Sequence, residues 1–141
     1  MTVRLARITE QPLSLDEHIA AVDSRTAGAV TTFVGRVRDH DPDASDAVVA
    51  LEYTSHPDAE PTLNRIAEAA AEGTDAVVAV SHRVGRLGVG EAAVAIAVAS
   101  SHRDEAFTVC REVIEAIKRE LPVWKRQVEA DGTTAWKGIG G

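Results

Sequence analysis

Two lysines near the end of a predicted long helix are the residues best suited to carry chemistry. Lys118 and Lys125 lie in the segment KRELPVWKR, residues 118–126, where Pro122 ends the helix and turns the chain. Two amines held close together lower each other's pKa, which suits proton transfer or nucleophilic attack. The alternative is that both lysines are cations that stabilise the carboxyl end of the helix. The residues alone leave both interpretations open.

The junction between a predicted strand and the long helix is a second candidate, here for binding an anion. Free backbone N–H groups and the helix dipole favour a phosphate or a carboxylate at such a junction. A capped helix with solvent-exposed polar side chains is the alternative. The residues at this junction are Ser100, Ser101, His102 and Arg103.

A third basic group lies in the segment Gly35-Arg36-Val37-Arg38. In a strand, Arg36 and Arg38 point to the same face, where two guanidinium groups can bind a phosphate. Taken alone, the pair is also typical of a strand face that contacts solvent. Basic groups from three separate elements together predict a substrate with several negative charges.

Other motifs are weaker signals of chemistry. The glycines of GRLGVG, residues 85–90, are in the wrong order for a phosphate-binding loop and predict a turn between two strands. Cys110 falls on the apolar face of the long helix and predicts an inert core thiol. The histidines lack the spacing of metal ligands, and a single cysteine excludes a multi-cysteine site. We therefore expect neither a metal nor a cofactor.

Apolar periodicity predicts an α+β fold with a mainly antiparallel sheet, three helices and a C-terminal hairpin. Ser14 and Glu17 form a capping box for the first helix, and Ser101 is expected to cap the long one. Asp131-Gly132 predicts the hairpin turn, across which Trp124 and Trp136 should face each other. The expected strands are 2–8, 28–37, 47–54, 75–84, 91–100, 124–130 and 133–137, and the expected helices are 15–22, 61–72 and 102–120.

Length and composition limit the class of protein. The 141 residues, 45% hydrophobic and 26% charged, predict a single globular domain over residues 1–141. No apolar run is long enough for a transmembrane helix, the first residues do not form a signal peptide, and the lone cysteine points to the cytoplasm. The net charge of -7 argues against nucleic-acid binding. A small anionic ligand remains the expected partner, with no nucleic acid and no membrane.

Five segments, in their order and spacing, resemble the large, catalytic subunit of molybdopterin synthase. The most specific features are the SHR-x-G-x-L-x-x-G-E pattern and the helix-ending K-x-x-x-P-x-W-K pattern. The resemblance extends from about residue 3 to Trp136. The segments are TFVGRVRDHD (32–41), LEYTSHPDAE (51–60), SHRVGRLGVGE (81–91), SSHRDEAF (100–107) and IKRELPVWKR (117–126).

This resemblance implies a sulfurtransferase of molybdenum cofactor biosynthesis with an α/β-hammerhead-type fold. The family converts cyclic pyranopterin monophosphate, or precursor Z, into the dithiolene of molybdopterin. The sulfur arrives as the C-terminal Gly-Gly thiocarboxylate of a small ubiquitin-like subunit. Large subunits pair as a homodimer, and a small subunit docks at each end to give a heterotetramer.

The resemblance also implies roles for residues at matching positions. Lys118 and Lys125 match the catalytic lysines, and Phe33 and Ile114 match positions that line the pocket. The implied substrate-binding set is Arg36, Val37, Arg38, His102, Arg103, Arg126 and Gln127.

A competing hypothesis is a non-catalytic regulatory dimer that binds a phosphorylated ligand on the same α+β frame. It predicts ligand binding that survives loss of both lysines. The terminal Gly140-Gly141 resembles the tail of the small carrier, and we interpret this likeness as a coincidence at the chain terminus.

Overall fold

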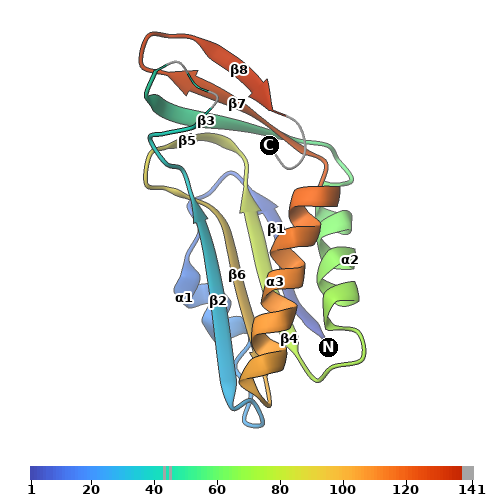
Figure 1. Ribbon diagram of the computed structural model, residues 1–141. Helices are drawn as coiled ribbons and strands as arrows, with labels where there is room; N and C mark the ends of the chain where they lie inside the picture. Colours follow the sequence, from blue (N-terminus) through green and yellow to red (C-terminus); the bar gives the residue numbers. More distant parts are fainter. Residues whose placement is uncertain (43, 45, 138–141) are drawn as a thin grey trace.

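The computed structural model describes residues 1–42, 44 and 46–137, and it confirms the α+β class (Figure 1). Gly140 and Gly141 lie outside the described residues. None of the described helices is long and apolar enough to span a membrane. The elements are β1 (Val3–Thr9), α1 (Leu15–Ala21), β2 (Ala29–Arg36), β3 (Val48–Ser55), α2 (Ala59–Ala71), β4 (Val77–Arg83), β5 (Gly85–Gly88), β6 (Ala92–Ser100), α3 (Arg103–Glu120), β7 (Val123–Glu129) and β8 (Thr134–Lys137).

The strands form two sheets, so the expectation of one sheet is wrong. The first sheet has the order β1-β4-β6-β2 and the second the order β5-β3-β7-β8. Strands β1 and β4 are parallel, and the other pairs are antiparallel. The second sheet begins with residues 85–88, which were expected to be only a turn. Gly85, at φ +93°, lets the chain leave β4, and Leu87 then pairs with Leu51 of β3 in the core.

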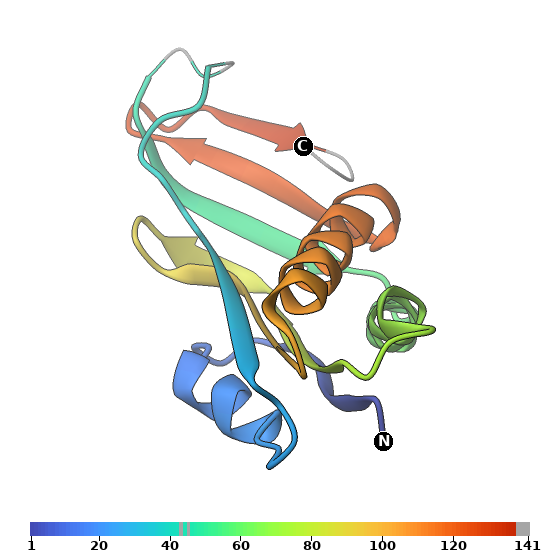
Figure 2. The same ribbon diagram turned by 60° about the horizontal axis from the view of Figure 1, so that its bottom comes forward.

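Helices cover both faces of the first sheet (Figures 1 and 2). Helices α2 and α3 pack on one face against valines and Ile96, while α1 packs on the other face against alanines such as Ala79 and Ala97. This division follows from the alternation of side chains along β4 and β6. The apolar stripe predicted on the long helix is buried, which confirms it: Ala106, Cys110, Val113, Ile117 and Leu121.

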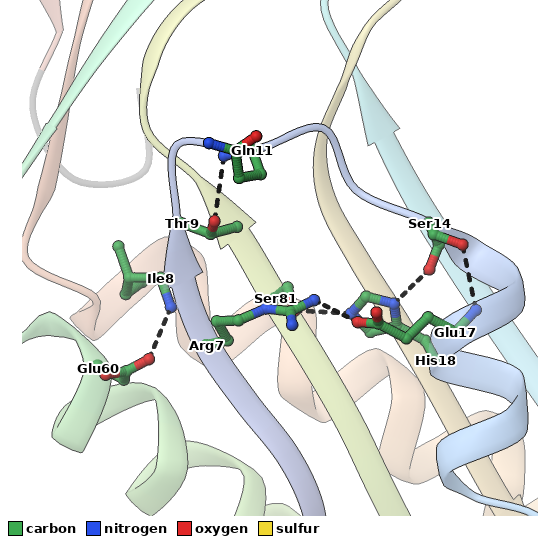
Figure 3. A network of polar contacts seen from close by, with 9 residues as sticks. All are labelled: Arg7, Ile8, Thr9, Gln11, Ser14, Glu17, His18, Glu60 and Ser81. Atoms are coloured by element: carbon green, nitrogen blue, oxygen red, sulfur yellow. Dashed lines mark hydrogen bonds and ion pairs between the residues drawn. The ribbon is translucent and has the colours of Figure 1, made fainter.

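A polar network fixes α1 to the first sheet (Figure 3). The backbone N–H of Glu17 donates to Ser14 Oγ at 3.2 Å, which confirms the predicted cap. His18 is fully buried, and its Nδ1 donates to the Ser14 carbonyl at 2.6 Å. Its Nε2 lies 2.7 Å from the hydroxyl of Ser81 on β4. These bonds hold Ser81 in place. Ser81 directly precedes His82 on β4.

The C-terminal hairpin forms as predicted, but its tryptophans do not face each other. Trp136 lies opposite Arg126, and Trp124 lies opposite Thr54 of β3. The turn fixes this register, because the backbone N–H of Glu129 donates to the carbonyl of Thr133 at 2.9 Å. The Arg126 guanidinium instead lies 5.6 Å from the centroid of the Trp136 ring.

Candidate active site

A pocket of about 310 Å³ lies where the carboxyl end of α3 meets the second sheet. Its lining comes from β2 and the residues after it, β3, β4, β6, α3 and β7. The volume is at the lower end of the range typical of small-molecule sites. Both sheets therefore contribute to one candidate site.

Basic side chains dominate the charged groups of this pocket. Lys118, Lys125, Arg36 and Arg38 line it, and Asp41 is the acidic residue among the described lining residues. Both arginines are thus at the same site, as predicted, but β2 ends at Arg36, so Arg38 lies beyond the strand that was expected to hold both. A cationic pocket on a protein of net charge -7 favours an anionic ligand locally.

The two lysines reach the pocket from consecutive elements, as the sequence predicts. Leu121, with only 2% of its surface exposed, ends α3, and Pro122 leads directly into β7. Lys125 then lies on the pocket face of β7, opposite Tyr53 of β3. Lys125 is half-buried, whereas Lys118 is exposed, and both side chains line the pocket. Lys118 therefore lies at the mouth of the pocket.

The turn after β5 positions Arg36. The Arg36 Nε donates to the carbonyl of Gly90 at 3.1 Å, and the backbone of Val37 pairs with both Gly90 and Glu91. Gly90 has a φ of +89°, and a Cβ there would lie 3.2 Å from the Arg36 guanidinium. The positive φ therefore favours glycine at position 90 of the SHR-x-G-x-L-x-x-G-E pattern, and a Cβ there would also displace the Arg36 guanidinium slightly. Val37 itself is buried and does not line the pocket.

A carboxylate anchors the same turn. Glu91 accepts a hydrogen bond from the Arg83 guanidinium at 2.6 Å and another from the backbone N–H of Gly88 at 2.8 Å. These bonds, the one from Arg83 first, lower the pKa of Glu91. Arg83, Gly88 and Glu91 therefore stabilise the turn beside the pocket, although they do not line the pocket themselves.

Strand alternation divides the implied residues of β7 between two faces. Gln127 is buried, lines the pocket and donates from its amide to Asp41. Arg126 lies on the opposite face, where its guanidinium pairs with Glu52 at 2.7 Å. Arg126 does not line the pocket. Phe33 and Ile114 do line it, as the family resemblance implies.

His102 and Arg103 lie at the far end of α3. They are exposed, and the sixteen residues from His102 to Lys118 correspond to roughly 24 Å of helix. Neither residue lines the pocket. One chain therefore does not bring them together with the lysine pair.

The chain's own carboxylate occupies the anion site predicted at the start of α3. Asp75 accepts hydrogen bonds from the Ser101 backbone N–H at 3.2 Å, from the Ser100 hydroxyl at 2.9 Å and from the Ser101 hydroxyl. The bonds from Ser101 and then Ser100 lower the pKa of Asp75. The expected cap by Ser101 is also wrong, because His102 is the N-cap and makes no side-chain cap bond.

Sequence reasoning missed two pocket residues, Tyr53 and His82. Their rings meet edge to face, with centroids 5.1 Å apart and an interplanar angle of 73°. Burial raises the pKa of Tyr53 to about 12, and burial is also the main cause that lowers the pKa of His82 to about 4. A histidine at the end of the apolar strand VVAVSHR was the available signal.

No cluster of three or more metal-binding side chains occurs in the part of the chain that the structure describes. Cys110 is buried outside the pocket, and burial raises its pKa to about 11, which confirms a core thiol. The pocket therefore presents lysines, arginines, a tyrosine and two histidines as its reactive groups.

Sequence comparison identifies the relatives of this chain. Residues 8–120 match the family model described as MoaE protein. The chain is 43% identical over 136 residues to molybdopterin synthase catalytic subunit 1 of Mycobacterium tuberculosis, covering 94% of this chain and 89% of that protein. It is 41% identical over 127 residues to the molybdopterin synthase catalytic subunit of Bacillus subtilis, covering 89% and 80%.

Structural comparison agrees with the sequence comparison. A crystal structure of molybdopterin synthase from Staphylococcus aureus has a TM-score of 0.86 at 31% identity, covering 93% of this chain and 95% of that chain. A complex of subunits 1 and 2 of molybdopterin-converting factor from Helicobacter pylori shares the fold, with a TM-score of 0.71 at 18% identity over 96% of this chain and 90% of that chain.

The fold and the site define an α+β enzyme subunit with a cationic pocket at the junction of two sheets. The chain belongs to the MoaE family, and the resemblance to molybdopterin synthase catalytic subunits is confirmed. These relationships do not favour the alternative of a non-catalytic regulatory dimer.

Proposed function

We propose that this chain transfers sulfur to cyclic pyranopterin monophosphate and so forms the dithiolene of molybdopterin. The observation that carries the proposal is a single pocket containing Lys118, Lys125 and the pair Arg36 and Arg38, in a chain of the MoaE family. The lysine pair distinguishes this site from a simple anion-binding site, because arginine alone would suffice to hold a phosphate.

The pocket suits a ligand with one anionic end and one flat aromatic end. The guanidinium groups of Arg36 and Arg38 bind the cyclic phosphate, as planar donors favour bidentate contacts with phosphate oxygens. Phe33, Ile114 and Tyr53 supply apolar surface for the pterin ring. The volume of about 310 Å³ lies at the lower end of the range typical of small-molecule sites, which suits one small ligand.

The two lysines transfer protons and stabilise negative charge during the reaction. Opening the cyclic phosphate leaves a negative oxygen that needs a proton, and an ammonium group at the pocket can supply one. Lys118, at the exposed mouth, is placed to meet both the substrate and an incoming protein tail, while Lys125 is half-buried on β7. We assign proton transfer and charge stabilisation to this pair.

The sulfur donor in this proposal is a small ubiquitin-like subunit with a C-terminal glycine thiocarboxylate. The Helicobacter pylori structure that shares the fold is a complex of two subunits of molybdopterin-converting factor, which supports a partner of this kind. The thiocarboxylate sulfur forms a bond to the pterin side chain, and water then cleaves the acyl–sulfur bond, which leaves the sulfur on the pterin and releases the small subunit as a carboxylate. Cys110 is buried outside the pocket, so sulfur need not pass through a cysteine of this chain.

His102 and Arg103 fit the same reaction if a second copy of the chain supplies them. They are exposed at the far end of α3, roughly 24 Å from Lys118, and cannot reach the pocket of their own chain. A homodimer, which the family resemblance implies, can bring that helix end to the neighbouring pocket. We therefore propose that each complete site combines residues from two copies.

Reconstitution tests this function. The purified chain, a small subunit with an enzymatically formed thiocarboxylate and cyclic pyranopterin monophosphate are mixed, and the oxidised pterin product is measured by fluorescence. A small subunit ending in an ordinary carboxylate is the matched control. Product that depends on the thiocarboxylate supports the proposal, and its absence despite folded chain and bound carrier contradicts it.

A further inference from the structure

His82 is a nearly buried polar group that the mechanism above does not use. It lies at the end of β4, lines the same pocket as both lysines and has only 8% of its surface exposed. The preceding residue, Ser81, faces the other side of the sheet and is held there by His18. The edge-to-face contact with Tyr53 restrains the imidazole ring further. His82 is thus fixed at the base of the site.

One ring nitrogen of His82 is committed to the main chain. Nδ1 lies 2.8 Å from the carbonyl oxygen of Arg83, and since a carbonyl can only accept, Nδ1 carries the proton. In a neutral imidazole the other nitrogen, Nε2, then has a free lone pair.

That second nitrogen belongs to a side chain that lines the pocket. No described residue forms a hydrogen bond with His82 Nε2. Among the described residues, the fully enclosed side-chain atoms without a partner are the Nε atoms of Arg7 and Arg126, so Nε2 of His82 keeps some accessible surface, and the residue lines the pocket. The structure therefore presents an unpaired acceptor on a side chain that is otherwise more than nine-tenths buried.

The surroundings keep this imidazole neutral. Burial is the largest cause that lowers the pKa of His82, and the charges of Lys118 and Lys125 lower it further, to about 4. The bond to the Arg83 carbonyl acts in the opposite direction. The other charged groups lining the pocket are Arg36, Arg38 and Asp41, and the lining also includes His40. At neutral pH the ring can accept a hydrogen bond but is too weak a base to take a proton from a lysine ammonium.

We propose that His82 Nε2 accepts a hydrogen bond from an N–H group of the pterin ring and thereby orients the substrate. The lysines and arginines of the pocket can only donate, so they attract the phosphate end of the ligand. The uncharged acceptor of His82, at the bottom of the pocket, instead attracts a hydrogen-bond donor. A pterin ring carries several N–H donors. This inference rests on the proposed function and adds a residue that determines which way round the substrate binds.

Two substitutions separate this role from packing. His82→Phe keeps a ring against Tyr53 but removes the acceptor, whereas His82→Gln keeps an acceptor of similar reach. We expect His82→Phe to raise the KM for the cyclic phosphate roughly tenfold, the loss of one buried hydrogen bond, with kcat changed less than about threefold. We expect His82→Gln to restore KM to within about threefold of the wild-type value.

The outcomes distinguish this inference from the proposed function. A wild-type chain without sulfur transfer contradicts the function itself. An active wild type with an unchanged KM in His82→Phe overturns only the role of His82, as does an equal rise of KM in both variants. If His82→Phe fails to fold, ¹⁵N NMR of the wild-type imidazole decides the question. Substrate should shift the Nε2 resonance and leave Nδ1 bonded, and an unchanged Nε2 under saturating substrate contradicts the proposal.

Discussion

The buried imidazole of His82 should make the fold sensitive to mild acid. Its pKa is about 4 in the folded chain and 6.5 in its ordinary state. Because the folded value is the lower one, the contribution of His82 to stability is complete above about pH 6.5 and is lost as the pH falls toward 4. Between pH 7.5 and pH 5 the difference corresponds to about 2 kcal/mol of the free energy of unfolding.

Urea unfolding measures this contribution of His82 to the free energy of unfolding. The wild-type chain and His82→Phe are compared at pH 7.5 and at pH 5, at one protein concentration. Asp75, Glu91 and Asp131 also have a lowered pKa. Their protonation changes the free energy of unfolding only at or below the ordinary pKa range of carboxylates, and it does so equally in both proteins. The wild type should lose about 2 kcal/mol more than the variant between the two pH values. Parallel losses in the two proteins would refute the buried, neutral state of His82.

Two further predictions concern how the site is assembled. Chains with Lys118→Ala and chains with His102→Ala should each be defective, but refolding them together should restore roughly a quarter of the wild-type activity, because half of the dimers are mixed and each has one intact site. No recovery would contradict a site that is shared between two copies of the chain. Gly90→Ala should raise the KM for the phosphate-bearing substrate several-fold, since the turn that receives Arg36 has a positive φ at this position and a Cβ would lie 3.2 Å from the Arg36 guanidinium. An unchanged KM, measured in steady-state assays, would show that this turn does not position Arg36.

The parts of the site that depend on local sequence could be predicted. The proline after Leu121 forces the turn that brings Lys125 to the same pocket as Lys118. The spacing of Arg36 and Arg38 likewise predicts a shared face, and both residues line the pocket. For the lysines a few neighbouring residues fix the geometry, whereas Arg36 also depends on its hydrogen bond to the distant Gly90.

The parts of the site that depend on contacts between distant strands could not be predicted. Tyr53 and His82 meet because β3 and β4 belong to different sheets that close on one pocket, and no spacing in the chain indicates this. The anion site predicted at Ser101 failed for a similar reason, since the carboxylate of Asp75 reaches it from a preceding loop. Matching a family motif did not reveal that Arg126 faces away from the pocket, because strand alternation decides that.

The most direct test of the central claim compares two neighbouring residues at the end of α3. In a single-turnover reaction with thiocarboxylated small subunit, sulfur incorporation into the pterin is followed by mass spectrometry for the wild type, Lys118→Ala and Arg119→Ala. Arg119 is the matched control, since it is exposed and does not line the pocket. We expect Arg119→Ala to match the wild type and Lys118→Ala to lose at least about 100-fold in rate while remaining folded. Wild-type rates in Lys118→Ala would contradict the assignment of this pocket as the active site.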